Sequence, residues 1–346
     1  MKGFIRFIAV VLVTGIFSCG PASQTRPSSS KTPTSTPTYT YNVNPLKNSL
    51  SIDMMAGDFR GGLAWVHVGN REGYIDRTGK FAIQPQYEMA GDFYEGLAWV
   101  KVGGRYGYIN MKGEMVISPQ FEQAFNFNQG LATVRVGNRY GYIDKAGKIV
   151  INAVYKSCGI FSEGYAWVRN ESDLEGYIDK KGSFAVIPQY QLCGDFSEGL
   201  AWVGVGNRYG YINKTGQYVI NPQYLGCGKF MGGLARYRDA TGSEGVINKK
   251  GEVVLSPRWR ALGDFYEGLT WAIDFNGLIG FIDRTGAYKV QPKYNWTGNY
   301  SGGLARVCYG GTVNNVTKRV VGGRWGYIDK NGVTVLEHNY DDACDF

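Results

Sequence analysis

The chain has 346 residues, of which 50 are glycine and 25 are tyrosine. This composition favours many short β-strands separated by tight turns and argues against a helical protein. The formal net charge of +8 is spread along the chain without a cluster of lysine and arginine, which argues against nucleic-acid binding.

The chain opens with a predicted signal peptide, residues 1–18. Lys2 and Arg6 come before an apolar run of about eleven residues. The run is too short to span a bilayer but is typical of a signal-peptide core. An ordinary secretory signal or an uncleaved anchor would show the same pattern of charge and hydropathy.

The end of this segment favours a lipoprotein. Ile16–Gly20 reads IFSCG, which resembles the lipobox of bacterial lipoproteins, with a small residue directly before the cysteine. The resemblance implies cleavage before Cys19 and lipid modification of its sulfur, and hence a lipid-anchored protein of the bacterial cell envelope. Gly20 occupies the position at which some bacteria place an aspartate that retains a lipoprotein in the inner membrane. The lack of this aspartate favours the outer membrane.

A tether is predicted over residues 19–50, after the lipid anchor. Its sequence is rich in Ser, Thr and Pro and poor in apolar side chains, so it cannot bury enough surface to offset the entropy of ordering. At roughly 3 Å per residue in an extended state, it would hold the next domain on the order of 80 Å from the lipid. The folded domain is then residues 51–346.

This domain repeats one sequence pattern. The string GDFYEGLAWVKVGGRYGYINMKG at Gly91–Gly113 returns in close form at Gly194–Gly216. The glycine of each GYID-like string recurs at intervals of 34 or 35 residues, apart from a last interval of 46. A fixed period of this length indicates an array in which each unit buries its apolar face against its neighbours. These glycines are Gly73, Gly107, Gly141, Gly176, Gly210, Gly245, Gly280 and Gly326.

Each unit is predicted to be a three-stranded antiparallel meander. Leu97–Val102 and Arg105–Asn110 are β-rich runs around a Gly-Gly hairpin signal, and Glu114–Phe121 is the third run. An Asp or Asn ends the second run and a glycine follows three residues later, which predicts a capped turn with a positive φ. Such pairs are Asp76 with Gly79, Asp144 with Gly147, Asp179 with Gly182 and Asp283 with Gly286. One carboxylate in each loop is too few for a calcium site, so no metal is expected.

The pattern resembles the WG repeat family, also called KWG repeats. The family's unit is a Trp-Gly-Tyr-Ile-Asp hairpin, a glycine, an Ile-Pro strand end and a Phe before Gly-Leu-Ala, and the resemblance covers nearly all of Ile52–Phe346. The Trp-Gly dipeptide itself occurs only at Trp325-Gly326. Elsewhere the Trp position holds Tyr106, Tyr140, Tyr209, Glu72, Glu175, Glu244 or Ile279. The family is defined by its repeat, so the resemblance implies no catalytic or ligand-binding residues.

The predicted fold is all-β, an array of about eight antiparallel β-meander units of 34–35 residues. The near-integer number of units fits both a closed eight-bladed, propeller-like ring and an open, curved, solenoid-like array. Because a period of 34 residues is short beside the roughly 40 to 50 of propeller repeats, we favour the open array.

Cys158, Cys193 and Cys227 share one repeat position, which Ala90 and Ala124 occupy in earlier units. A position that accepts Ala or Cys is expected to be small and buried. Neighbouring units could instead bring two of these thiols within disulfide distance in an oxidising compartment. Buried thiols are favoured, and a metal site is not expected because no fourth ligand accompanies the row.

Two features are candidates for binding. One is a row of tryptophans at one repeat position, which includes Trp65, Trp99 and Trp202. Both faces of this strand are fairly apolar, which favours packing of the indoles in the core. The alternative is an exposed ladder of indoles that stacks on sugar rings. The other feature is the insertion Cys308–Gly323, because insertions in repeat proteins map to loops, often on the binding face. It offers Tyr309, Asn314, Asn315, Lys318 and Arg319.

No catalytic motif is evident in the sequence. The two histidines, His67 and His338, stand in different repeats and in no nucleophile or metal motif. We therefore predict a non-catalytic cell-envelope lipoprotein, without a cofactor, whose array is a scaffold for a protein partner. A glycan-binding or cell-wall-binding module that uses the Trp row is the alternative.

Overall fold

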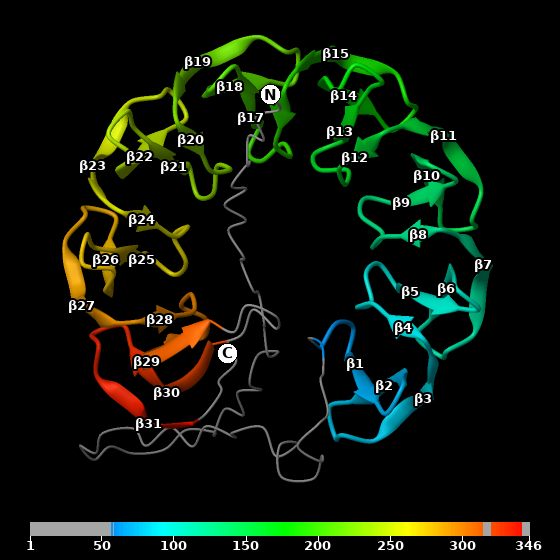
Figure 1. The fold of residues 1–346 in the computed structure, drawn as a ribbon, viewed down its shortest axis with the longest axis horizontal. Coiled ribbons are helices and arrows are strands. Elements are labelled where there is room, and N and C mark those ends of the chain that lie inside the picture. The colour runs from blue at the N-terminus through cyan, green and yellow to red at the C-terminus, as the bar shows by residue number, and fades with distance from the viewer. Residues whose placement is uncertain (1–56, 58, 314–319, 341–346) are drawn as a thin grey trace, which may run out of the picture.

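The computed structural model describes residue 57, residues 59–313 and residues 320–340 (Figure 1). All regular elements in this part of the chain are β-strands, so the all-β prediction is confirmed. The strands form eight antiparallel sheets, one for each sequence repeat, which are called units 1 to 8 in chain order. The predicted signal peptide, Cys19 and the tether lie outside the described residues.

The strand bounds of the first four units follow the repeat. Unit 1 contains β1 (Leu63–Val68), β2 (Arg71–Asp76) and β3 (Phe81–Tyr87). Unit 2 contains β4 (Met89–Ala90), β5 (Leu97–Val102), β6 (Arg105–Asn110) and β7 (Met115–Phe121). Unit 3 contains β8 (Gln123–Ala124), β9 (Leu131–Val136), β10 (Arg139–Asp144) and β11 (Ile149–Tyr155). Unit 4 contains β12 (Ser157–Cys158), β13 (Tyr165–Arg169), β14 (Glu175–Asp179) and β15 (Phe184–Tyr190).

The last four units have the same plan. Unit 5 contains β16 (Leu192–Cys193), β17 (Leu200–Val205), β18 (Arg208–Asn213) and β19 (Tyr218–Tyr224). Unit 6 contains β20 (Gly226–Cys227), β21 (Leu234–Arg238), β22 (Glu244–Asn248) and β23 (Val253–Trp259). Unit 7 contains β24 (Ala261–Leu262), β25 (Leu269–Ile273), β26 (Ile279–Asp283) and β27 (Tyr288–Tyr294). Unit 8 contains β28 (Trp296–Thr297), β29 (Leu304–Val313), β30 (Val320–Asp329) and β31 (Thr334–Tyr340).

The prediction of three strands per unit is wrong for units 2 to 8, which have four. The additional strand has only two residues, as in β4, and it pairs antiparallel with the strand that follows it. Hydrogen bonds from Glu88 N to the Lys101 carbonyl oxygen (2.9 Å) and from Gly91 N to the Trp99 carbonyl oxygen (3.0 Å) flank this pairing. A two-residue strand is too short to show an alternation of polar and apolar residues, so the sequence pattern does not reveal it.

A β-bulge in the last strand explains the glycine of each GYID-like string. In unit 2, Tyr106 pairs with Phe121 but Tyr108 pairs with Ile117, so a two-residue step on β6 faces a four-residue step on β7. The bulge brings the β7 backbone against Gly107, where a Cβ would overlap the carbonyl oxygen of Ile117. All eight units share this register shift.

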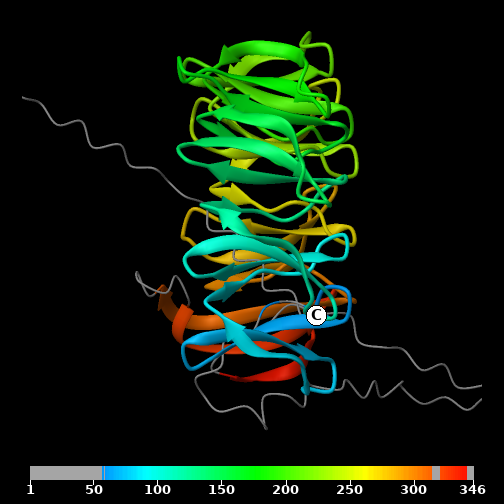
Figure 2. The same ribbon diagram turned by 90° about the vertical axis from the view of Figure 1, so that its right-hand side faces the viewer.

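The units follow one another around a central opening as segments of an incomplete ring (Figure 1). The two-residue strand lies innermost in its unit and the last strand lies outermost (Figure 1), and the strands run across the thickness of the ring (Figure 2). Unit 1 and unit 8 are the two ends, and within the described residues the core clusters at these ends contain residues of their own unit alone, unlike the clusters between neighbouring units. The open array favoured by the sequence is therefore confirmed.

The core lies between units rather than within them. At the boundary of units 1 and 2, Tyr74 and Ile83 pack with Phe93 and Val100 of the next unit in one buried cluster. The rings of Tyr74 and Phe93 are 4.8 Å apart, and burial raises the pKa of Tyr74 well above its usual value. The same pair recurs as Tyr108 with Phe127, Tyr142 with Phe161, Tyr177 with Phe196 and Tyr211 with Phe230. Each unit thus completes the core of its neighbour, as expected for a repeat array.

Candidate binding surface

A row of tryptophans lies toward the inner side of the array, on the first long strand of five of the eight units. The row comprises Trp65, Trp99, Trp167, Trp202 and Trp271, all half-buried. Each indole lies against a glycine of its own unit, such as Gly91 beside Trp99 and Gly194 beside Trp202, where a Cβ would overlap the ring. The indoles are therefore neither fully buried in the core nor exposed as a continuous ladder.

In unit 3 the large and the small residue of this pair are exchanged. Phe125 stands where the other units have the glycine, and Thr133 stands where most of them have the tryptophan. Phe125 is exposed and Thr133 is buried, with its hydroxyl donating to the Gly159 carbonyl oxygen at 3.2 Å. A small residue stands beside a large one in both arrangements.

An open pocket of about 270 Å³ lies between units 1 and 2, and Asn126 of unit 3 also contributes to its lining. Its walls include the indoles of Trp65 and Trp99, and its polar lining includes Glu72, Asp92 and Asn126. The Oδ1 atom of Asn126 is buried and makes no hydrogen bond to the described residues. The pocket thus combines two aromatic walls with oxygen acceptors, which is chemistry suited to a ligand group that donates hydrogen bonds.

Three glutamates at the position of the family's tryptophan make polar contacts between units, and two of them, Glu175 and Glu244, are buried. Glu175 accepts hydrogen bonds from Arg169 Nη2 (2.6 Å) and from Cys193 N of the next unit (2.5 Å). Burial raises the pKa of Glu175, and the Arg169 guanidinium opposes that rise. Glu244 binds Arg238 and Leu262 N in the same way, and Glu72 binds His67 and Ala90 N. This role was not predicted from the sequence, although a basic residue on the facing strand of each hairpin was an available signal.

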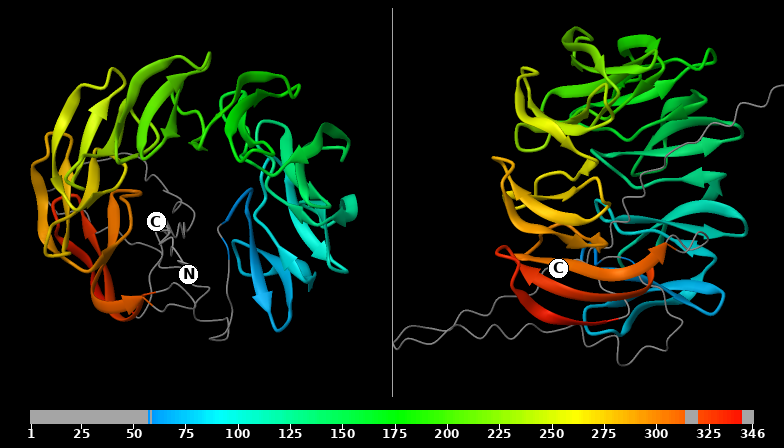
Figure 3. Two further views of the ribbon diagram at one scale, coloured as in Figure 1. Left: turned by 45° about the horizontal axis from the view of Figure 1, so that its top comes forward. Right: turned by 60° about the vertical axis from the view of Figure 1, so that its left-hand side comes forward.

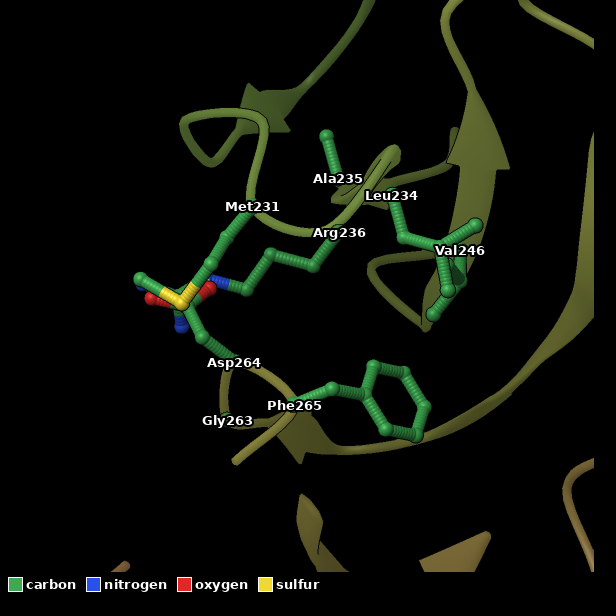
Figure 4. Close-up of a pocket in the computed structure, with 8 residues that line it drawn as sticks. All are labelled: Met231, Leu234, Ala235, Arg236, Val246, Gly263, Asp264 and Phe265. Atoms are coloured by element: carbon green, nitrogen blue, oxygen red, sulfur yellow. The ribbon is translucent and has the colours of Figure 1, made fainter. Parts of the chain in front are cut away.

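A small cavity lies between units 6 and 7, and its lining includes Arg236 and Asp264 together with the core residues Leu234, Val246 and Phe265 (Figure 4). Arg236 replaces the tryptophan there, and its side chain extends to Asp264, with Nε 3.8 Å from the carboxylate oxygen. Its Nη1 also donates to the Leu262 carbonyl oxygen at 2.9 Å. Val246 stands in place of the tyrosine of the inter-unit core, and the remaining cavity measures about 10 Å³. Arg236 therefore places a guanidinium at the position where five other units have an indole.

A second row of polar contacts, which was not predicted from the sequence, joins neighbouring units. Glu95 has a φ of 50°, and its carboxylate accepts a hydrogen bond from Gly130 N (3.0 Å) and lies 3.1 Å from Lys145 Nζ, both in unit 3. Burial opposes ionisation of Glu95, but Lys145 and the backbone donors outweigh it and lower the pKa. The row continues as Glu163 with Lys214, Glu198 with Lys249 and Glu267 with Lys330. Each glutamate fixes the turn of the following unit.

The predicted turn residues lie on the turn between the second and third long strands of each unit. Gly79, Gly147, Gly182 and Gly286 have φ between 82° and 84°. The Oδ1 atom of Asp144 accepts two backbone hydrogen bonds, from Ala146 N (3.0 Å) and Lys148 N (2.9 Å). These aspartates therefore cap turns, and this role accounts for their recurrence.

The cysteines of the repeated position are free thiols, of which Cys193 is buried and Cys158 and Cys227 are half-buried. Burial raises the pKa of Cys158 to about 11 and that of Cys227 to about 12. Each lies beside the hydroxyl of a core tyrosine, Tyr142 and Tyr211 respectively. Thiols with raised pKa values are poor nucleophiles and poor metal ligands at neutral pH.

The predicted insertion forms an extension of the β29–β30 hairpin, visible in orange in Figure 3. Pairing continues past Tyr309↔Arg324 to Val313↔Val320. Tyr309 is 39% exposed and packs against Tyr294, with ring centroids 4.9 Å apart. Asn314, Asn315, Lys318 and Arg319, the other candidates in this hairpin, lie outside the described residues.

Residues 57, 59–313 and 320–340 contain no group of three or more His, Cys, Asp or Glu placed to hold a metal ion. They also contain no helix with the length and hydropathy needed to cross a membrane.

Fold and surface together define the class of this protein, an open β-repeat array whose units share their cores. The profile of the family described as WG containing repeat matches residues 73–106, 106–140, 140–172, 176–209, 209–239, 245–273, 279–312 and 325–346. The chain therefore belongs to the WG-containing repeat family. The eight matches equal the eight units in number, and the match at residues 73–106 begins in unit 1 and ends in unit 2.

Solved structures give only weak likenesses. The computationally designed Ika8 protein has 10% identity and a TM-score of 0.43, covering 80% of this chain and 93% of its own. BamB from Moraxella catarrhalis has 14% identity and a TM-score of 0.42, covering 64% and 79%. Kluyveromyces lactis Hsv2 has 10% identity and a TM-score of 0.39, covering 78% and 96%. No curated protein sequence matches this chain.

Proposed function

We propose that this chain is a non-catalytic, lipid-anchored binding scaffold of the bacterial outer membrane, and that its array captures a protein partner. The observation that carries the proposal is a difference in burial between two sets of repeated aromatic residues. Tyr74 and its counterparts are fully buried in the inter-unit cores, whereas Trp65 and Trp99 remain half-buried around an open pocket. Half-buried aromatic side chains beside a pocket are typical of recognition surfaces.

The extended β29–β30 hairpin is the second element of the proposed surface. Its two strands have ten residues each, whereas the corresponding strands of the other units have five or six. Exposed Tyr309 stands at the start of the extension and is held in place by its contact with Tyr294. Aromatic residues on a rigid strand lose little entropy on binding, so Tyr309 is suited to contact a partner.

Attachment to the membrane rests on Cys19 and is tested by fractionation. Wild-type chain and a Cys19→Ser variant are expressed in a Gram-negative host, and inner and outer membranes are separated on a density gradient. The wild type is expected in the outer-membrane fraction and the variant in the soluble fraction. Retention of Cys19→Ser in the membrane would overturn the lipid anchor.

Partner capture is tested with a pull-down of envelope extract by the full chain. In the comparison variant, residues 310–323 are replaced by Gly-Asn, which restores the two-residue turn that units 3 and 5 use and leaves the pair Tyr309↔Arg324 intact. The wild type is expected to enrich a protein that the shortened variant loses. Enrichment of wall glycan alone, insensitive to protease treatment of the extract, would replace this proposal by the glycan-binding alternative.

A further inference from the structure

The boundary between units 3 and 4 departs from the repeat at three neighbouring places. Phe125 is the one residue other than glycine at its repeat position in the eight units, and Ile160 is the one apolar residue at its position. The third departure is Thr133, at the position where five other units have tryptophan. This boundary therefore differs in sequence from every other boundary of the array.

Hydrogen bonds connect these three residues. Phe125 N donates to the Thr133 carbonyl oxygen at 3.0 Å. The Thr133 hydroxyl donates to the carbonyl oxygen of Gly159, the residue directly before Ile160, at 3.2 Å. Phe125 and Ile160 come just after the innermost strands β8 and β12, on the side of the central opening (Figure 1). Thr133 thus links an apolar residue of unit 3 with an apolar residue of unit 4 on the inner surface.

Both apolar side chains are exposed to solvent. Phe125 is 43% exposed and Ile160 is 41% exposed. At the next boundary the indole of Trp167 reaches Asp195, which has the repeat position of Ile160, and donates a hydrogen bond to it. Thr133 replaces that indole and is too short to extend over Ile160. Phe125 and Ile160 therefore form an exposed surface, which is called the inner apolar patch.

The ring of Phe125 is supported from one side. The ring of Tyr140 lies 6.4 Å away between centroids, and the Tyr140 hydroxyl donates to Gln123 Oε1 at 2.6 Å. A side chain that is already held by its neighbours loses less conformational entropy when it binds a ligand. The patch is thus prepared for binding rather than a loose contact.

The chemistry of the patch favours an apolar ligand group over a sugar. The flat indole and the carboxylate that Trp167 and Asp195 provide at the next boundary are both replaced, so an aromatic face and an acceptor for sugar hydroxyls are lost together. Ile160 is branched and has no flat face. An exposed apolar patch with polar residues at its rim is typical of a protein interaction site.

The patch continues into the pocket of the proposed binding surface. Asn126 directly follows Phe125 and lines the pocket between Trp65 and Trp99. A protein segment in the pocket can therefore extend onto the patch. A lipid acyl chain fits less well, because it would extend beyond two apolar side chains onto polar residues such as Asn126 and Gln123.

We infer that the inner apolar patch binds a bulky apolar side chain, such as leucine or phenylalanine, presented by the protein partner. The inference rests on the proposed function and names the chemistry of the partner at this place. The bound side chain removes Phe125 and Ile160 from water. An apolar anchor of this kind contributes a large share of the affinity of a protein interface.

A selection from random peptides displayed on phage tests the inference. The target is the full chain, immobilised through a C-terminal tag in the presence of phospholipid nanodiscs, because detergent would compete for an apolar patch. Empty nanodiscs remove phage that bind lipid. The enriched peptides are expected to share a bulky apolar residue, and its replacement by alanine is expected to weaken binding at least about tenfold in fluorescence anisotropy.

A variant that restores the repeat is the matched comparison. Phe125→Gly/Thr133→Trp/Ile160→Asp is expected to bind the selected peptides at least about tenfold more weakly than the wild type. Its three new residues are those of the boundary between units 4 and 5, namely Gly159, Trp167 and Asp195. Thermal melts show whether it folds. Ile160→Asp, a single change at an exposed position, gives the same test with less disturbance of the core.

Val150→Asp is the control, because it introduces the same charge at a side chain that is 40% exposed on β11, the outermost strand of unit 3. It is expected to keep wild-type affinity for the selected peptides. Equal weakening by Val150→Asp and Ile160→Asp would show that the charge acts at a distance and would overturn the inference.

Three further results would overturn it: enriched peptides that bind the restored-repeat variant and Ile160→Asp as tightly as the wild type, enriched peptides that need no apolar residue, or competition by chitotriose. A selection that enriches no peptide over empty nanodiscs would also count against it. If the envelope pull-down still enriches a protein in these cases, the proposed scaffold function stands and only the apolar anchor fails.

Discussion

The hydroxyl of Tyr177 donates a 2.7 Å hydrogen bond to the carbonyl oxygen of Gly194, across the boundary between units 4 and 5. The same bond joins units at Tyr74, Tyr108, Tyr142 and Tyr211. Because both groups are removed from water, each bond leaves an unsatisfied acceptor when it is lost. Cohesion between units therefore depends on a polar contact inside an otherwise apolar core.

Tyr177→Phe is expected to lower the free energy of unfolding by about 1 to 3 kcal/mol, because the ring is retained and only the hydrogen bond is lost. Urea unfolding measured by circular dichroism checks this value. Val219→Ala, on the exposed outer strand, serves as the control and should change the free energy by less than about 0.5 kcal/mol. Equal midpoints for Tyr177→Phe and wild type would show that the bond contributes nothing.

Gly147 has a φ of 82°, and an added Cβ would lie 3.0 Å from Cγ2 of Ile117 in the preceding unit. Gly147→Val is expected to cost about 1 to 3 kcal/mol through backbone strain, with a further loss from this contact. Asp144→Ala removes two capping bonds at an exposed turn and is expected to cost less. Thermal melts of the two variants rank the effects, and the opposite ranking would contradict the role given to the glycine.

The positive φ of Glu95 gives a test with two substitutions at one residue. Glu95→Gly and Glu95→Ala both remove the contacts to Gly130 and Lys145, but only glycine adopts a φ of 50° without strain. Glycine occupies this position naturally at Gly61, Gly232 and Gly302. Glu95→Ala is therefore expected to be less stable than Glu95→Gly by about 1 kcal/mol. Equal stabilities would remove the argument from backbone strain.

Stability is expected to fall as the pH drops below about 4.5. The pKa values of Glu95, Glu163, Glu198 and Glu267 are lowered because lysine and backbone donors outweigh the opposing effect of burial. A hydrogen bond from Thr285 is the main cause that lowers the pKa of Asp283 to about 2. A lowered pKa means that the stabilisation is present above the unfolded-state value and is lost as the pH falls through the folded-state value.

Glu175 and Asp195 act in the opposite direction, because burial raises their pKa values and favours the folded state at low pH. They are fewer than the residues with lowered values, so a net loss is expected. Melting temperatures between pH 7 and pH 2 measure it. A melting temperature that stays constant or rises over this range would contradict the ion-pair network between units.

The sequence predicted most of this fold because period and turn chemistry are local signals. Leu97–Val102 and Arg105–Asn110 coincide with β5 and β6, and β7 begins one residue after the start of the predicted third run. The innermost strand was not predicted, since Met89–Ala90 is too short to carry a pattern. The fold prediction succeeded for the long strands and turns, which the sequence of a single unit specifies.

The candidate surface was predictable only in part. Trp65 and Trp99 were recognised as one row, but nothing in their spacing shows that they share a pocket with Asn126, which comes from a third unit. The contact of Glu72 with Ala90 N likewise becomes apparent only when unit 2 is placed beside unit 1. Contacts between units depend on the curvature of the array, which a single repeat does not encode.

The measurement that tests the scaffold most directly is site-specific photo-cross-linking in cells that express the full chain. A benzoylphenylalanine replaces Met89, which is 42% exposed on the innermost strand beside the pocket, or Val219, which is 43% exposed on the outermost strand of unit 5. If the inner surface binds a protein partner, Met89 yields a discrete cross-linked protein and Val219 does not. Cross-links from Val219 alone, or none from Met89, would contradict a binding surface on the inner strands.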